Sequence, residues 1–320
     1  MTDVAGRAAD LGYALGWRLV GALPAPVAAG GFRMGADLAA RRGGPGVRQL
    51  RLNLARVLAS RESNDGAEPA HCAGVDLDEV VAEAVRSYAR YWREAFRLPR
   101  MDATAVHDSV ESVVQGVRHL DDALEAGKGV VIALTHSGNW DVAGLWLVEA
   151  LRRRGRPATF ATVAERLRPA SLYDRFVDYR RSLGFEVLPA DAGARTVATL
   201  AARLRAGGVV CLVADRDLSG AGVEVDFFGA RARMPGGPAQ LARHTGAALL
   251  PVAGWFTEDG WGLRFRPPPV TPAEAAGTEV AMVTQMLADA FASGIAEHPA
   301  DWHMLQPIWT ADRARVETSR

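Results

Sequence analysis

A histidine and an aspartate five positions apart stand at a junction between an expected strand and an expected helix. His136 follows the mostly apolar run 130–135, which is typical of a fully buried strand. Asp141 begins the apolar segment 141–153, whose pattern predicts a helix. In open α/β sheets, ligands bind in the crevice at the carboxyl ends of the strands. A histidine at that place can act as a general base, because its unperturbed pKa lies near neutrality.

Both residues also have a structural interpretation. Asp141 can simply be an acidic residue that interacts with the positive end of the helix dipole. His136 is compatible with a core histidine whose ring nitrogens are both hydrogen-bonded. The spacing alone therefore indicates a catalytic pair without establishing one.

A second aspartate is a candidate partner for the histidine. Asp215 ends the apolar run 209–214, so we expect it to emerge at the same edge of the sheet as His136. An aspartate within reach can orient the imidazole and stabilise the imidazolium that forms when the ring takes a proton. The sequence leaves open whether Asp141 or Asp215 makes that contact. Asp215 is also compatible with a strand-end residue that only bonds a turn.

The elements that must position these residues alternate between strand and helix. This alternation predicts a single α/β domain with a mostly parallel, mixed sheet of about seven strands flanked by helices. Two pairs of closely spaced strands indicate local antiparallel additions, 209–214 with 223–228 and 248–256 with 262–266. The expected strands are 130–135, 157–163, 185–189, 209–214, 223–228, 248–256 and 262–266. The expected helices are 141–153, 170–182, 194–206, 236–245 and 277–297.

Residues 1–61 form a basic, apolar segment in front of this domain. Their pattern predicts three helices, over 3–21, 27–40 and about 46–60. The segment holds nine arginines and three acids, a net charge of +6. We interpret it either as an N-terminal helical cap over the core or as an amphipathic surface that lies on an anionic membrane. The division is therefore 1–61 for this segment, 62–309 for the α/β domain and 310–320 for a polar, poorly ordered tail.

Composition excludes several other classes of protein. The 320 residues carry a formal net charge of zero, so nothing in the total indicates nucleic acid binding. No run of about 18 uncharged apolar residues predicts a membrane span. The two cysteines, Cys72 and Cys211, have no partner ligands at zinc spacing, so we expect no metal site. We also predict a helix from about 78 to 96, with arginines along one face. That face is either solvated or a surface that contacts phosphate groups.

The wider chain resembles a known family. The run from His136 to Asp141 is similar to the His-x4-Asp signature of the glycerolipid and lipid A acyltransferases. The chain resembles most the actinobacterial phosphatidylinositol mannoside acyltransferases, within the branch that includes the lipid A lauroyl and myristoyl acyltransferases. The resemblance covers most of residues 10–310. The stretches that carry it are 87–99, 136–141, 163–167, 182–189, 214–218, 225–229 and 299–307.

The resemblance implies a membrane-associated O-acyltransferase at the cytoplasmic membrane face. It would transfer a fatty acyl chain, expected to be palmitoyl, from acyl-CoA as co-substrate to a mannose hydroxyl of a phosphatidylinositol mannoside, with no further cofactor. His136, Asp141 and Asp215 would be catalytic. The alternatives are a related enzyme with another lipid acceptor and an inactive lipid-binding adaptor.

Three further polar residues lie in or beside the matching stretches. By resemblance, Glu165, Arg180 and Arg216 would hold the acceptor head group or brace the site. They are equally compatible with internal ion pairs. Near the end of the chain, Trp302 and His303 are interpreted as packing residues.

Overall fold

The computed structural model describes residue 16 and residues 19–64, 76–165, 170–217 and 220–313. Most of the helix predicted over 3–21 lies outside these residues. So does most of the loop predicted over 62–76. The helix before that loop continues to Asn64, four residues beyond the predicted end.

A six-stranded sheet forms the centre of the molecule. Its strand order is β3-β2-β4-β1-β7-β8, and every neighbouring pair is parallel except the antiparallel pair β7–β8. The predicted single α/β domain with a mostly parallel, mixed sheet is therefore confirmed. The strands are β1 (Val130–Leu134), β2 (Phe160–Ala164), β3 (Phe185–Pro189), β4 (Val209–Val213), β7 (Ala248–Phe256) and β8 (Trp261–Phe265).

One detail of the predicted sheet is wrong. The segment 223–228 does not pair with 209–214. It forms β5 (Val223–Phe227), which pairs only with β6 (Ala230–Met234) in a separate two-stranded hairpin. β6 was not predicted, because alternating alanine and arginine give it little apolar signal. The turn between β5 and β6 was not recognised either. Its residue Phe228 has a φ of 51°, a conformation that glycine or asparagine normally occupies.

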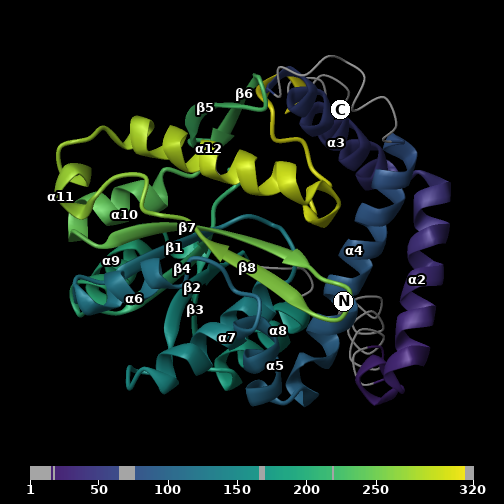
Figure 1. Cartoon of the computed structure of the whole chain (residues 1–320), viewed down its shortest axis with the longest axis horizontal. Coiled ribbons are helices and arrows are strands. Elements are labelled where there is room, and N and C mark those ends of the chain that lie inside the picture. The colour runs from purple at the N-terminus through teal and green to yellow at the C-terminus, as the bar shows by residue number, and fades with distance from the viewer. Residues whose placement is uncertain (1–15, 17–18, 65–75, 166–169, 218–219, 314–320) are drawn as a thin grey trace, which may run out of the picture.

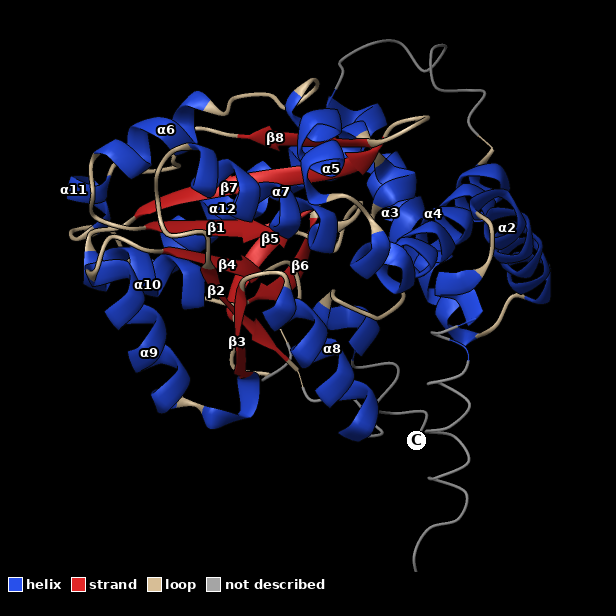
Figure 2. Ribbon diagram, turned by 90° about the horizontal axis from the view of Figure 1, so that it is seen from below, coloured by secondary structure: helices blue, strands red, loops and turns tan. Residues whose placement is uncertain are grey.

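Alternate residues of the central strands enter two different cores. In β1, Val130 and Ile132 belong to one apolar cluster, and Val131 and Ala133 belong to another. Helices cover both faces of the sheet for this reason (Figures 1 and 2). The first face packs against α5 (Ala103–Glu111), α6 (Arg118–Glu125), α7 (Trp140–Arg153) and α8 (Ala170–Ser182). The second packs against α9 (Ala194–Arg205), α10 (Gly237–Thr245) and α12 (Val280–Glu297), with the short α11 (Pro272–Ala275) beyond.

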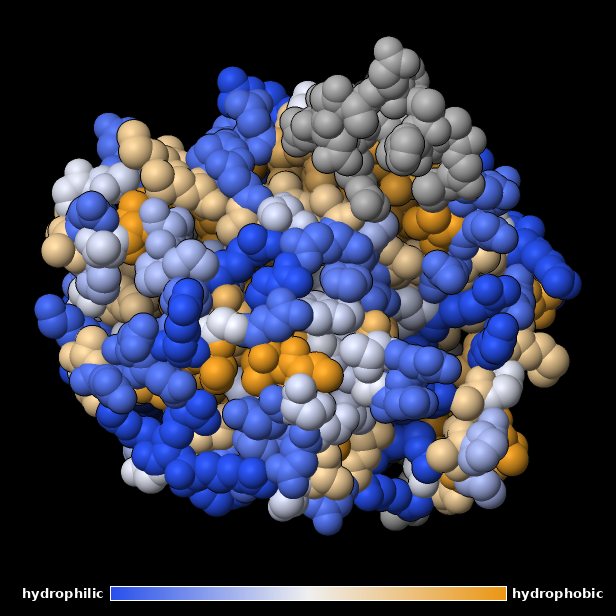
Figure 3. All heavy atoms as spheres, in the orientation of Figure 1, coloured by the Kyte–Doolittle hydropathy of each residue, from blue (hydrophilic) through white to orange (hydrophobic). Residues whose placement is uncertain are grey.

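Three N-terminal helices form a cap at one end of the sheet. They are α2 (Ala25–Arg42), α3 (Pro45–Asn64) and α4 (Leu77–Arg97), and they enclose a third, smaller apolar cluster. Figure 1 shows α2 at the outer edge, packed along α4. Apolar side chains appear on the surface along that edge in Figure 3. In the described part of the chain, no helix is long and apolar enough to cross a membrane.

The arginines of α4 bind other parts of this chain. Arg86 pairs with Asp37 of α2 at 2.5 Å, and Arg97 donates to two backbone carbonyls that precede α2. Arg90 donates to two carbonyls in the turn between β7 and β8, and Arg93 lies beside a buried glutamate. Arg86 and Arg97 thus join α4 to α2 and the segment before it, Arg90 joins α4 to the β7–β8 turn, and Arg93 pairs within α4. The four side chains form neither a purely solvated face nor a free phosphate surface.

The first residues of the predicted polar tail are ordered. Residues 310–313 are helical, and Asp312 is buried, with its carboxylate 3.0 Å from Arg56. Arg313 donates to the backbone carbonyl of Asp217 at 2.6 Å. The remainder of the predicted tail lies outside the described residues.

Candidate active site

Two adjacent parallel strands bring a histidine and an aspartate together. β1 and β4 are paired with Leu134 opposite Val213, so the residues two positions further along each strand face each other at the sheet edge. His136 Nδ1 lies 2.5 Å from Asp215 Oδ1, and the backbone N–H of His136 donates to Asp215 Oδ2 at 2.9 Å. The aspartate that contacts the ring is therefore Asp215.

The surroundings of Asp215 determine which nitrogen of His136 carries the proton. Asp215 is fully buried, and Oδ2 also accepts a hydrogen bond from Trp302 Nε1 at 2.9 Å. Burial raises the pKa of this carboxyl, but the charge and hydrogen bonds of His136, with that of Trp302, outweigh burial and lower the pKa below its usual value. An ionised carboxylate only accepts hydrogen bonds. Nδ1 of His136 therefore carries a hydrogen, which leaves Nε2 as the basic nitrogen of the neutral ring.

Asp141 has different partners. It lies in the first turn of α7 and is 1% exposed. Arg180 of α8 donates to its two carboxylate oxygens at 2.8 and 3.1 Å, and Tyr91 of α4 donates its hydroxyl at 3.1 Å. Burial opposes the charge of Arg180, but Asp141 outweighs it and raises the pKa of the guanidinium. The structure thus places Asp141 and Arg180 in an internal ion pair.

The other two polar candidates lie at the entrance of a cavity. Arg216 Nη2 is 3.3 Å from a carboxylate oxygen of Glu165, and Arg216 Nη1 donates to the side chain of Gln306. Glu165 is more than half exposed, whereas Arg216 is largely covered. Within the described residues, Arg216 Nε is buried and makes no hydrogen bond. The Asp141–Arg180 pair also lines the cavity, but its carboxylate is buried, whereas that of Glu165 is exposed.

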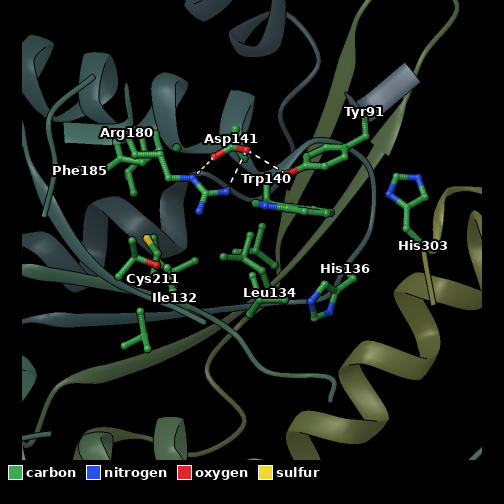
Figure 4. Close-up of a pocket in the computed structure, with 18 of the residues that line it drawn as sticks. Tyr91, Ile132, Leu134, His136, Trp140, Asp141, Arg180, Phe185, Cys211 and His303 are labelled. Carbon is green, nitrogen blue, oxygen red and sulfur yellow. Dashed lines mark hydrogen bonds and ion pairs between the residues drawn. The ribbon is translucent and has the colours of Figure 1, made fainter. Parts of the chain in front are cut away.

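The cavity has a volume of about 430 Å³ and lies between the sheet and α7. His136 is at one end, and Phe185 lies at the other, as Figure 4 shows. Phe160 and Phe185 are in contact there, with ring centroids 4.5 Å apart. A Cβ added at Gly144 of α7 would come within 2.5 Å of the Phe185 ring, so only glycine allows this close packing. The walls between these ends are mainly apolar, with Ile132, Leu134, Leu147, Cys211, Val213, Val252, Leu263 and Phe265.

Several residues near His136 were not predicted to belong to the site. Trp302 is a packing residue, as expected, but its indole also bonds Asp215. The ring of Trp140 lies edge-on to His136 with centroids 5.7 Å apart and stacks on Tyr91 at 4.0 Å. His303 also lines the cavity; burial and the nearby His136 lower its pKa to about 3, so the ring is neutral. No local pattern marks these residues, although 87–99 and 299–307 do fall in the stretches that carry the family resemblance.

An α/β sheet with a histidine–carboxylate pair at its carboxyl edge, next to a long apolar cavity, is the arrangement of an acyltransferase. Residues 3–311 match the family described as "Bacterial lipid A biosynthesis acyltransferase", and the chain belongs to this family. Comparison thus agrees with the resemblance seen in the sequence: the protein is an acyltransferase.

Its curated relatives are similar over nearly their whole length. A phosphatidylinositol mannoside acyltransferase of Mycolicibacterium smegmatis is 51% identical over 319 residues, which cover 98% of this chain and 97% of the relative. A protein of the same name from Mycobacterium tuberculosis is 52% identical over 312 residues, covering 97% of this chain and 92% of the relative.

Proposed function

We propose that this acyltransferase moves a fatty acyl chain, palmitoyl in the first instance, from acyl-CoA to a mannose hydroxyl of a phosphatidylinositol mannoside. His136 is the general base, and the reaction takes place at the cytoplasmic face of the cell membrane. The observation that carries the proposal is the His136–Asp215 pair at the mouth of the apolar cavity. The printed names of the relatives support the choice of acceptor.

The geometry supports a direct transfer with one histidine. Nε2 of His136 takes the proton of the mannose hydroxyl as its oxygen attacks the thioester carbonyl. The imidazolium that forms lies against the ionised Asp215, which stabilises its charge. When the tetrahedral intermediate collapses, the carbon–sulfur bond breaks and His136 returns the proton to the leaving thiolate. The enzyme forms no covalent intermediate, and protons balance over the cycle.

The cavity matches an acyl chain in its chemistry. Its walls offer apolar side chains and one buried thiol, and burial raises the pKa of that thiol of Cys211, so it stays neutral. A thioester carbonyl held beside His136 places its alkyl chain along the sheet toward Phe185. The polar entrance with Glu165 and Arg216 is left for the sugar and phosphate groups of donor and acceptor.

The cap supports attachment to a membrane surface. Three apolar residues of α2 are exposed: Val27, Met34 and Leu38. Met34 and Leu38 lie 7 and 11 positions after Val27, so the three share one helical face. Arg41 and Arg42 are exposed at the end of the same helix. An apolar stripe with adjacent arginines suits a helix that lies in the interface of an anionic bilayer.

The reaction is tested by release of the thiol from palmitoyl-CoA with a panel of acceptors. We expect fast release only with phosphatidylinositol mannosides, and mass spectrometry of the product should place the new ester on mannose. Preference for a lysophospholipid or for a lipid A precursor would overturn the acceptor. An adaptor without activity would release no coenzyme A with any acceptor.

Membrane attachment is tested by sedimentation with anionic liposomes. Replacing Val27, Met34 and Leu38 with serine should reduce binding strongly. A matched control changes three exposed apolar residues elsewhere, Val197, Met282 and Met286, to serine and should bind normally. Equal binding by both triple variants would rule out α2 as the membrane surface.

A further inference from the structure

A buried carboxylate of the cap reaches the turn that follows His136. Glu94 of α4 is 3% exposed and accepts hydrogen bonds from four donors. Oε1 accepts from Arg90 Nε at 2.7 Å and from Arg93 Nη2 at 3.4 Å. Oε2 accepts from Asn139 Nδ2 at 2.8 Å and from Trp261 Nε1 at 2.7 Å. The carboxylate thus joins the cap, the β7–β8 hairpin and the start of α7.

Its contact with Asn139 determines how that amide is oriented. The side chain of Asn139 has a donor end and an acceptor end. An ionised carboxylate accepts only, so the amide must turn Nδ2 toward Glu94. Its oxygen then faces α7 and accepts from the backbone N–H of Val142 at 3.1 Å, which caps the helix.

The turn between His136 and Asn139 is short and closely packed. Gly138 has a φ of 61°, and its N–H donates to the backbone carbonyl of Asp301 at 2.9 Å. A Cβ at Gly138 would come within 2.8 Å of the backbone nitrogen of Trp255, so the turn lies directly on β7. The backbone carbonyl of His136 accepts from His303 N at 2.8 Å. Only two residues separate Asn139 from His136, so a change at Asn139 acts close to the backbone that carries the His136 ring.

We propose that Glu94 is a positioning residue for His136 and acts by holding the amide of Asn139 in one orientation. The inference rests on the proposed role of His136 as base. Neither Glu94 nor Asn139 is among the residues that line the cavity, so the effect concerns turnover rather than binding of the donor.

The test exchanges donor and acceptor between the two side chains. In Glu94→Gln, an amide NH₂ group replaces one of the two carboxylate oxygens. Whichever way the amide turns, its NH₂ group faces donors that bonded the lost oxygen. We expect turnover to fall about tenfold or more while the KM for palmitoyl-CoA stays within about twofold, as suits one buried, unsatisfied polar group. Asn139→Asp places two carboxylates together and should also lower turnover.

The double variant Glu94→Gln with Asn139→Asp restores a donor opposite an acceptor between these two side chains and keeps the total charge of the cluster. Trp261 Nε1, which donates to the same oxygen of Glu94 as Asn139 does, then faces a donor, so only part of the loss is recovered. An aspartate caps a helix as well as an asparagine does. We expect turnover at least about fivefold above that of the poorer single variant. The control is Glu186→Gln on β3, which breaks the ion pair between Glu186 and Arg203. It should leave turnover unchanged.

The outcomes separate this inference from the proposed function. Normal turnover in folded Glu94→Gln, or no recovery in the folded double variant, overturns the positioning role. If Glu94→Gln does not fold, Asn139→Ser gives the second test, since serine keeps the cap but not the bond to Glu94; normal turnover there also overturns it. Full activity of His136→Ala would instead overturn the general-base mechanism itself.

Discussion

The sheet edge around Asp215 and the first turn of α7 around Asp141 each bury one aspartate, and the two aspartates are held differently. Asp215 lies against an imidazole that is 27% exposed and reaches the cavity. Asp141 lies against Arg180 and Tyr91; the carboxylate and the phenol are buried, and Arg180 is 18% exposed where the pair lines the same cavity. One carboxylate thus supports an imidazole that can take and return a proton during a reaction, whereas the other is paired with a guanidinium that keeps its proton.

This difference separates proton transfer from architecture. A histidine–aspartate pair can stabilise a charge that appears and disappears during a reaction. An arginine–aspartate pair carries the same charges at every step, so we assign it to holding α7 and α8 in place below the site. The His-x4-Asp spacing identifies both features, but it does not distinguish their roles.

Removing the imidazole should have the largest effect on the reaction. We expect His136→Ala to lower turnover by about 10²–10⁴-fold, the usual contribution of a general base. The melting temperature should change little, because the ring lies at a cavity and not in the core. Turnover close to that of the unmodified protein, with intact structure, would remove His136 from the mechanism.

Breaking the buried ion pair should affect stability more than chemistry. Arg180→Met leaves Asp141 without its charge partner, which costs about 3–5 kcal/mol of unfolding free energy. Denaturant titration should show this loss, and Asp141→Asn combined with Arg180→Met should recover part of it. If Arg180→Met instead abolishes turnover at unchanged stability, Arg180 binds substrate and the comparison with Asp215 fails.

Neutralising Asp215 should lower turnover by about 10²-fold, since the imidazolium loses its counter-charge. Folding lowers the pKa of Asp215, so its charge stabilises the folded state above the ordinary pKa of 3.8. That contribution is lost as pH falls through the folded pKa. The stability gap between the unmodified protein and Asp215→Asn should therefore be present at pH 7 and shrink below about pH 4. A gap that widens on acidification would contradict the assigned pKa shift.

The smallest effect should come from the indole that supports Asp215. Trp302→Phe keeps the aromatic packing against Phe227 but removes one hydrogen bond to a charged group, and we expect about tenfold lower turnover. The control is Trp309→Phe, because the indole of Trp309 donates to the backbone carbonyl of Phe227. If both variants behave alike, Trp302 acts through packing and not through Asp215.

The sequence predicted the sheet because its central strands are continuous apolar runs. β1 and β4 are buried on both faces, so 130–135 and 209–214 stood out from their surroundings. β6 escaped prediction because alternate positions are arginine and its turn uses Phe228. Boundaries of the cap helices also differed: α3 continues to Asn64, although the residues after Ala59 give no apolar signal.

The site was predictable where it depends on strand ends and not where it depends on side-chain direction. Parallel pairing of β1 with β4 was enough to bring His136 near Asp215. The direction of Asp141 depends on where α7 begins, and Asn139, which caps α7, is bonded to Glu94, 45 residues earlier. Such a long-range hydrogen bond leaves no periodic trace in a single sequence.

The pairing of β1 with β4 also determines which insertions the chain can accept. His136 and Asp215 are 79 positions apart, and the excursion between β1 and β4 consists of α7, β2, α8, β3 and α9 with their loops. Lengthening a surface loop of that excursion leaves the pairing of the two strands intact. One extra residue inside Val209–Val213 would turn the aspartate to the opposite face of the sheet. Length variation among related chains should therefore collect in the excursion and avoid the five residues of β4.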